Sequence, residues 1–273
     1  MTITALKTFP GVALAVVLVL VLSPLPVGAR QTVAQPGHSV TWPSQRELVE
    51  SSIRDGVVDR IEHVPIGVTK PKRVYFRGDL PVRSAAWKPL MPGRYNGYWE
   101  SYKSEIAAYE LDKLLGLDMV PPAVERQVKG DIGAAVMWVE GVKGWDPSVA
   151  IAPPNPLEWT RQVVRMKMFD QLIANIDRNQ GNLLYDGDFH LILIDHSRAF
   201  TTTSDITTMA RPTMFDAAVW NRLKALTLPD LQASLGKWLG KRELEAILKR
   251  RDRMALQLDK MIQERGEAAV LMK

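Results

Sequence analysis

Residues 173–182 read Ile-Ala-Asn-Ile-Asp-Arg-Asn-Gln-Gly-Asn, and residues 192–198 read Ile-Leu-Ile-Asp-His-Ser-Arg. An Asp-Gly pair at 186–187 separates two apolar runs, which is a strong local signal for a β-hairpin. The second run, 189–194, is almost entirely apolar, so we expect it to form a buried strand. Asp195 follows that strand directly. The hairpin is therefore expected to bring Asp195 back beside Asn182.

The spacing of the polar residues in this stretch is typical of a phosphoryl-transfer site. Asp177 and Asn182 are separated as the aspartate and asparagine of a kinase catalytic loop are. In such a loop one carboxylate, here Asp177, orients the attacking hydroxyl and accepts its proton. An amide and a second carboxylate, here Asn182 and Asp195, hold Mg²⁺ or Mn²⁺ against the phosphates. The alternative is that both aspartates are ordinary loop acids, which their order and the intervening hairpin disfavour.

The same residues resemble those of the atypical kinases. Residues 175–182 and 194–200 are similar to motifs of the secretory-pathway four-jointed and Golgi casein kinase family, the HipA-type bacterial kinases and, more remotely, the phosphatidylinositol kinases. Residues 104–116 with Val-Pro-Pro at 120–122 resemble the secretory branch. The resemblance implies an α+β, two-lobed protein-kinase-like fold. It has a small antiparallel-sheet N-lobe at 56–140, a mainly helical C-lobe at 141–273, and a nucleotide site between them.

A lysine in an apolar strand is the second candidate feature. Lys88 ends the run Ala-Ala-Trp-Lys, and a lysine buried there is costly unless it is paired. Kinases use such a lysine to hold the nucleotide phosphates. The resemblance makes Glu105, on a predicted helix at 100–115, the partner of Lys88 and an aid in positioning the metal. Two alternatives are an edge-strand Lys88 that points to water and Glu110 as the partner.

Residues 135–141 are predicted to join the lobes. Their backbone is expected to hydrogen-bond an adenine, which makes Met137, Trp138 and Val139 candidate nucleotide-binding residues. Met137 and Trp138 are also candidates to pack against the adenine ring, although an ordinary core role for them is the alternative.

Periodicity and turn signals predict the remaining elements. Strands are expected at 57–64, 66–69, 73–76, 82–90, 124–128 and 134–139, and helices at 157–174, 214–226, 229–239 and 241–263. The helix at 157–174 delivers the catalytic loop. Asp170 near its end is expected to buttress that loop. Arg178 is expected to shield the carboxylate, contact phosphate or form a structural ion pair.

Composition excludes several other chemistries. The chain has 273 residues and no cysteine, so disulfides, thiolate catalysis and cysteine zinc sites are excluded. The four histidines lack metal-ligand spacing. The formal charge of +5 is mild; it suits a nucleotide and does not argue for nucleic acid.

The first 29 residues have the three-part pattern of a secretory signal peptide. Lys7 is followed by an apolar run at 12–22, and Val-Gly-Ala at 27–29 offers small residues for cleavage. The run is short for a membrane span, so cleavage is expected, with an uncleaved anchor as the alternative that would tie the protein to a membrane. Residues 30–55 are predicted to be a flexible leader, although a helix can begin near residue 45.

The sequence therefore predicts an exported, periplasmic or extracellular, ATP-dependent kinase. Ser or Thr of a protein is the first choice of acceptor. The alternatives are a sugar or other small-molecule kinase and a nucleotide-binding pseudokinase or interaction module. The secretory branch often carries an acid where this chain has Asn182, so the choice between Mg²⁺ and Mn²⁺ stays open.

Overall fold

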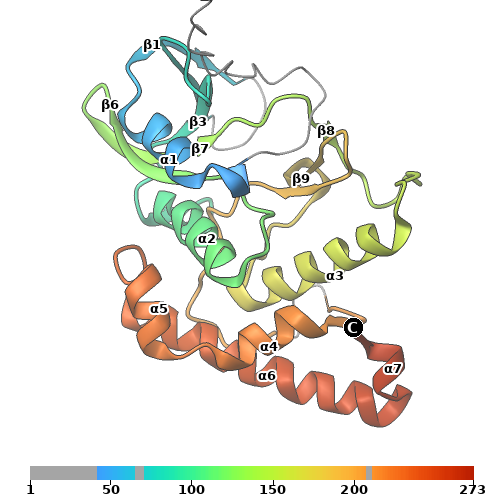
Figure 1. Ribbon diagram of the computed structural model, residues 1–273. Helices are drawn as coiled ribbons and strands as arrows, with labels where there is room; N and C mark the ends of the chain where they lie inside the picture. The colour runs from blue at the N-terminus through green and yellow to red at the C-terminus, as the bar shows by residue number, and fades with distance from the viewer. Residues whose placement is uncertain (1–41, 65–70, 207–210) are drawn as a thin grey trace, which may run out of the picture. The chain divides into compact units, whose positions relative to one another are not determined.

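A computed structural model describes residues 42–64, 71–206 and 211–273, all within one compact unit that spans residues 35–273 (Figure 1). The predicted signal peptide, residues 30–41 of the predicted leader and the predicted strand at 66–69 lie outside the described residues. Within the described ranges, no helix combines the length and the apolar character that crossing a membrane requires.

The N-lobe is built on a five-stranded antiparallel sheet in the order β1-β2-β3-β7-β6. Its strands are β1 (Val58–His63), β2 (Lys72–Phe76), β3 (Ser84–Lys88), β6 (Ala123–Val128) and β7 (Asp131–Met137). Lys88 pairs with Ala134 across β3 and β7, and β2 covers the other edge of β3. Because β3 is the central strand, the edge-strand interpretation of Lys88 is wrong.

The segment before this sheet is helical. Residues Trp42–Ser44 form the 3₁₀ helix η1, and α1 (Arg46–Asp55) follows it and packs on β6 and β7. Trp42 and Ile53 are fully buried in the core of the sheet. The prediction of a flexible leader at 30–55 is therefore wrong for residues 42–55. The apolar residues Val49 and Ile53 lie one helical turn apart, and that short stripe is enough to dock an otherwise polar helix.

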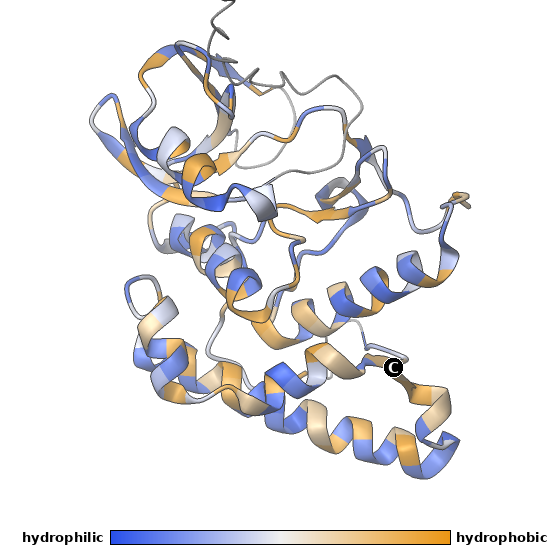
Figure 2. Cartoon of the chain, viewed as in Figure 1, coloured by the Kyte–Doolittle hydropathy of each residue, from blue (hydrophilic) through white to orange (hydrophobic). Residues whose placement is uncertain are grey.

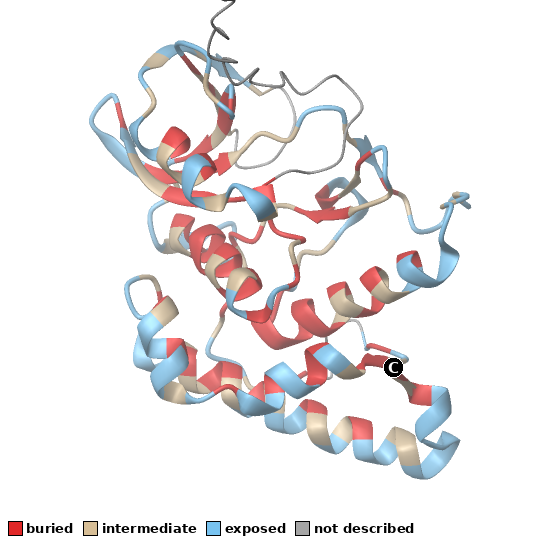
Figure 3. Cartoon of the chain, in the orientation of Figure 1, coloured by how far each residue is buried: buried red, intermediate tan, exposed pale blue. Residues whose placement is uncertain are grey.

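Helix α2 (Tyr102–Leu115) ends where the sequence predicts and begins two residues later than predicted, because Glu100 belongs to strand β5 (Tyr98–Glu100) and Ser101 is the N-cap. The Ser101 side chain caps its N-terminus by accepting a hydrogen bond from the Lys103 N–H group, and Gly116 ends it in the left-handed conformation at φ 58°. Helix α2 contacts β6 and β7 on one side and α5 on another, and Figure 3 shows it buried along most of its length. Glu105 therefore lies on a helix that is packed on more than one side.

Strand β10 links the cores of the two lobes. Strands β8 (Lys143–Gly144), β9 (Leu183–Tyr185) and β10 (Leu191–Leu193) form a small antiparallel sheet, with the predicted hairpin between β9 and β10. Ile192 packs into the N-lobe core, whereas Leu191 and Leu193 pack into the larger helical core. Burial on both faces explains the unbroken apolar run, and it fixes the point at which Asp195 emerges.

The C-lobe is mainly helical, as predicted. Its elements are α3 (Pro156–Ile173), η2 (Gln180–Asn182), α4 (Ala217–Ala225), α5 (Leu228–Leu235), α6 (Lys241–Arg265) and α7 (Glu267–Val270), with a short parallel pair β11 (Phe215–Asp216) and β12 (Leu271–Met272). Figure 2 shows hydrophilic and hydrophobic residues interspersed along α6, and the apolar residues Leu244, Ile247, Met254 and Leu258 of this helix are buried. The α+β, two-lobed prediction is confirmed.

Candidate active site

Three charged side chains from distant parts of the chain meet between the sheet and the helices. The Lys88 Nζ atom lies 2.6 Å from Glu105 Oε1 and 2.9 Å from Asp195 Oδ1. Lys88 and Glu105 are buried, with 8% and 2% of their surface exposed. The structure thus brings together the predicted lysine of β3, the predicted glutamate of α2 and the predicted aspartate after β10.

One ammonium group serves two carboxylates in this cluster. Burial alone would lower the pKa of Lys88, but the Glu105 and Asp195 carboxylates outweigh it and raise that pKa. Burial works against the charge of Asp195, yet Lys88 lowers the Asp195 pKa to about 2. Burial raises the pKa of Glu105, with Lys88 opposing the shift. Lys88 and Asp195 are therefore charged at neutral pH, and Glu105 is the carboxylate whose charge is least favoured.

The turn after β10 is tied to α2. The His196 N–H group donates to Glu105 Oε2 at 3.1 Å, so both oxygens of Glu105 accept hydrogen bonds within the protein. Asp195 adopts a positive φ of 61°, which is uncommon for a residue other than glycine and is frequent at functional sites. Burial, with the nearby Arg178, holds the pKa of His196 well below its usual value. His196 is therefore a neutral, structural imidazole.

The loop after α3 is shaped by Arg178. Its guanidinium forms a two-pronged ion pair with Asp170, with both contacts at 2.9 Å, and donates to the carbonyls of Asn182 and Ile194 at 3.1 and 2.8 Å. The prediction that Asp170 buttresses the loop is confirmed. Of the three interpretations of Arg178, the structural ion pair is the one observed. Its guanidinium binds Asp170 and connects the loop to the end of β10.

Asp177 is placed at the open side of this loop. Its side chain is 37% exposed, and its carbonyl accepts a hydrogen bond from Asn182 Nδ2 at 3.0 Å. Its carboxylate oxygen Oδ2 lies 3.1 Å from Arg198 Nη1. Arg198 in turn pairs with the buried Glu100. The predicted pair Asp177 and Asn182 is thus side by side, with an acidic group that a substrate can reach.

Sequence reasoning missed Arg198 and Glu100. Arg198 stands three residues after Asp195, within the motif at residues 194–200. A charged residue at that place could have been identified from the sequence as a candidate site residue. Glu100 carries no sequence signal of its own, because its role depends on β5 (Tyr98–Glu100) folding against the turn after β10. The Ser101 N–H group donates to the Ser197 carbonyl at 3.0 Å and makes that contact.

Two side chains of the site, Asn182 and Asp195, have oxygen atoms that suit a hard divalent cation. Asn182 uses its Nδ2 atom within the protein, and no hydrogen bond to its Oδ1 atom is found among the described residues. Asp195 is partly exposed and has a second carboxylate oxygen besides the one on Lys88. Within the described ranges there is no cluster of three or more His, Cys, Asp or Glu side chains placed to hold a metal. An amide and a carboxylate, completed by phosphate oxygens and water, is the ligand set that Mg²⁺ accepts.

The segment that joins the lobes already uses two of its N–H groups. Met137 donates to the Pro122 carbonyl at 2.8 Å, and Trp138 donates to the Ser84 carbonyl at 3.1 Å. Arg73 lies over the Trp138 ring, 4.2 Å from its centre. The sheet ladder ends at Met137, and among the described residues no backbone hydrogen bond of Val139 is found, so Val139 is the predicted adenine contact whose N–H group is not engaged by another backbone group. All three side chains are partly exposed.

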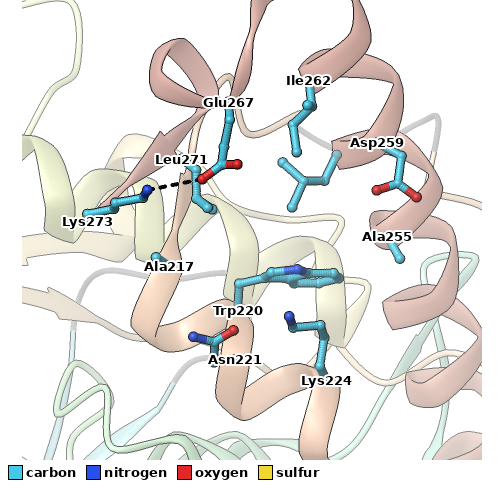
Figure 4. A pocket seen from close by; sticks show the side chains of 11 residues that line it. Ala217, Trp220, Asn221, Lys224, Ala255, Asp259, Ile262, Glu267, Leu271 and Lys273 are labelled. Carbon is cyan, nitrogen blue, oxygen red and sulfur yellow. Dashed lines mark ion pairs between the residues drawn. The ribbon is translucent and has the colours of Figure 1, made fainter.

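A separate pocket of about 660 Å³ lies in the C-lobe (Figure 4). Trp220 of α4, Ile262 of α6 and Leu271 of β12 line it, and an ion pair between Lys273 and Glu267 closes one side. It contains none of the predicted site residues. The candidate active site is therefore defined by the charged cluster and not by this pocket.

The comparisons with known proteins bear on the fold. No protein-family profile and no curated protein sequence matches the chain. A crystal structure of the Golgi casein kinase with Mn and ADP bound superposes with a TM-score of 0.63 at 17% identity, covering 84% of this chain and 78% of that chain. The structure of hydra Fam20 with sugar superposes with a TM-score of 0.65 at 17% identity, covering 88% and 95%.

The chain therefore has a two-lobed, kinase-like fold. A second Golgi casein kinase structure agrees, with a TM-score of 0.64 at 16% identity over 84% of this chain and 79% of that one. In this chain, Lys88 of β3, Glu105 of α2 and Asp195 after β10 meet where these elements come together.

Proposed function

We propose that the protein is an exported, ATP-dependent kinase that transfers the γ-phosphoryl group to a hydroxyl, with Ser or Thr of a protein as the first choice of acceptor. The observation that carries this proposal is the buried contact of Lys88 with Glu105 and Asp195 beside the half-exposed Asp177. Burying one cation with two carboxylates carries a large desolvation cost, which favours a functional role for this cluster. Its neighbours have the residue types and order that phosphoryl transfer requires.

Each residue has a role in this mechanism. Asp177 orients the acceptor hydroxyl and takes its proton. Lys88, anchored by Glu105, contacts the nucleotide phosphates, and Val139, with the Met137 and Trp138 side chains, contacts the base. Asn182 and Asp195 would hold Mg²⁺ or Mn²⁺, which when bound would neutralise the phosphates. Metal binding by Glu105 stays a prediction; both of its oxygens accept hydrogen bonds from the protein.

Two relatives support parts of this proposal. The Golgi casein kinase structure holds Mn and ADP, which supports a nucleotide with a divalent metal here. The hydra Fam20 structure holds a sugar, which keeps a sugar or other small-molecule hydroxyl as the second choice of acceptor. A pseudokinase is disfavoured because the chain retains every residue that the reaction is expected to need.

The test is transfer from labelled ATP by a protein that begins at Arg30. The label is followed into protein substrates, free sugars and water, with Mg²⁺, with Mn²⁺ and with a chelator. We expect metal-dependent label in one acceptor class. Transfer to sugars alone would replace the protein acceptor by the second choice, and absence of any nucleotide binding or transfer would refute the proposal.

Export rests on residues 1–29 and has its own test. We expect N-terminal sequencing of the protein, recovered by fractionation of its native cells, to begin at Arg30. A membrane fraction that retains Met1 would favour the anchor. Soluble cytoplasmic protein that retains Met1 would refute export.

A further inference from the structure

Arg198 is held rigidly on the acceptor side of the candidate active site. Its Nε and Nη2 atoms both lie 2.8 Å from Glu100 Oε1, and Glu100 is 2% exposed. Its guanidinium lies over the Tyr98 ring, 4.5 Å from the ring centre. Nε, Nη2 and one face of the Arg198 guanidinium are therefore in contact with residues of β5. The third nitrogen, Nη1, does not take part in these contacts.

The remaining nitrogen, Nη1, lies beside the carboxylate of Asp177. Nη1 lies 3.1 Å from Asp177 Oδ2. Among the residues that the structure describes, Arg198 is the one cation that forms an ion pair with Asp177. Arg178, the residue that follows Asp177, pairs with Asp170 and donates to backbone carbonyls. The next residue along the loop, Asn179, carries no charge.

The other cation of the site, Lys88, forms its ion pairs with acids other than Asp177. Lys88 is paired with Glu105 and Asp195, on the nucleotide and metal side. A phosphoryl group moving from that side toward a hydroxyl at Asp177 spreads negative charge over its equatorial oxygens. Arg198 is the cation that lies beside Asp177, where this charge would arrive.

We propose that Arg198 is a further catalytic residue of the phosphoryl transfer, and this inference rests on the proposed function. As the acceptor oxygen bonds to the γ-phosphorus, the bond from that phosphorus to the β–γ bridging oxygen breaks. The electron pair stays on ADP, and the acceptor proton goes to Asp177. Arg198 neither gains nor loses a proton: its Nη1 donates to an oxygen of the phosphoryl group in flight, while Glu100 holds the rest of the guanidinium in place.

The geometry suits this role because little has to move. A guanidinium is always protonated and presents its donors in a planar fork, so pinning two nitrogens orients the third. Donors that are already aimed at developing charge act without reorganisation during the reaction. The same contact in the free enzyme keeps Asp177 in place until a hydroxyl arrives.

The test uses four variants of the full chain. Arg198→Ala removes the group. Arg198→Met with Glu100→Gln removes it without leaving a buried, unpaired carboxylate. Arg198→Lys keeps the charge but loses the fork. Arg94→Met is the matched control, because Arg94 is an exposed arginine on the adjoining strand β4 (Gly93–Tyr95) and its one hydrogen bond is to the Gly97 carbonyl.

For each folded variant, kcat and KM for ATP are measured for transfer to the wild-type acceptor and for phosphate release to water. Guanidinium ion is then added well below denaturing concentrations. We expect kcat of the Arg198 variants to fall by about 10²–10³-fold. This is the size of the loss when one hydrogen-bond donor to the charge of a transition state is removed. KM for ATP should stay near the wild-type value, added guanidinium should restore part of kcat, and Arg94→Met should match the wild type.

Three results would overturn the assignment. They are a folded double variant with wild-type or higher kcat, a change confined to KM for ATP, and a loss of kcat that guanidinium does not restore. A higher kcat would identify the Asp177 contact as inhibitory. An inactive wild type refutes the proposed function and this inference together, whereas an active wild type with any of the three results refutes the role of Arg198 alone.

Discussion

Replacing Lys88 by methionine should destabilise the protein as well as inactivate it. The side chain is buried and makes contacts of 2.6 and 2.9 Å with two carboxylates. Methionine fills a similar volume but leaves Glu105 and Asp195 facing each other without a cation. Removing one partner of a buried ion pair costs about 3–5 kcal/mol of unfolding free energy. That is a large part of the 5–15 kcal/mol or so that is typical of a domain, so the variant should fold with a clearly lowered melting temperature.

The loss should depend on pH with a defined sign. Without Lys88, burial and the Asp195 charge raise the folded-state pKa of Glu105 further above its unfolded value of about 4.3. The folded variant then binds more protons than the unfolded chain between those two pKa values. Its stability should therefore be closest to that of the wild type at low pH and should fall as the pH rises through this window.

Urea unfolding of the wild type and three variants measures this effect. Lys88→Met with Glu105→Gln removes the orphaned charge and should recover part of the stability but no activity. Lys113→Met is the control, because Lys113 lies on α2, the helix that carries Glu105, and pairs with Glu50 and Glu110 at a partly exposed position. Such pairs contribute about 0–1 kcal/mol. Wild-type stability in Lys88→Met, or an equal loss in Lys113→Met, would refute the reasoning.

Three further predictions test neighbouring parts of the account. Asp195→Asn should weaken nucleotide binding in the presence of metal more than in its absence, as measured by calorimetric titration, and unchanged metal dependence would mark Asp195 as structural. Because Lys88, against the effect of burial, lowers the folded pKa of Asp195 to about 2, compared with about 3.9 when unfolded, Asp195 should contribute about 2–3 kcal/mol above pH 4 that is lost as the pH falls to 2 and below. The stability gap between the wild type and Asp195→Asn should shrink across that range, and a constant gap would contradict the linkage. Trp42→Ala should cost about 3–5 kcal/mol in urea unfolding because Trp42 is fully buried, and a cost near zero would restore a flexible leader.

The sequence predicted those parts of the site whose position follows from local pattern. The Asp-Gly pair and the apolar run placed the hairpin of β9 and β10, and strand geometry then set Asp195 beside Asn182. Lys88 was identified because a lysine in an apolar strand requires a partner. Glu105 was chosen over Glu110 on the resemblance, and the contact at 2.6 Å agrees with that choice.

The parts that escaped prediction depend on tertiary contacts without a local signal. Helix α1 looked like leader because its burial rests on a few residues, and Trp42 stands alone before it. Glu100 acquires a role only when β5 folds against the turn after β10. The sequence left three interpretations of Arg178 open because its partner, Asp170, lies in the preceding helix. Only the folded loop shows that Nε and Nη2 of Arg178 both donate to Asp170.

Comparison of the wild type with Asp177→Ala in a phosphoryl-transfer assay tests the central claim most directly. Both proteins are mixed with γ-labelled ATP, metal and the accepted hydroxyl substrate, and nucleotide binding is measured in parallel. We expect the variant to bind ATP like the wild type and to transfer label about 10²–10⁴-fold more slowly, because Asp177 meets the hydroxyl rather than the nucleotide. Transfer by the variant at the wild-type rate would contradict the account.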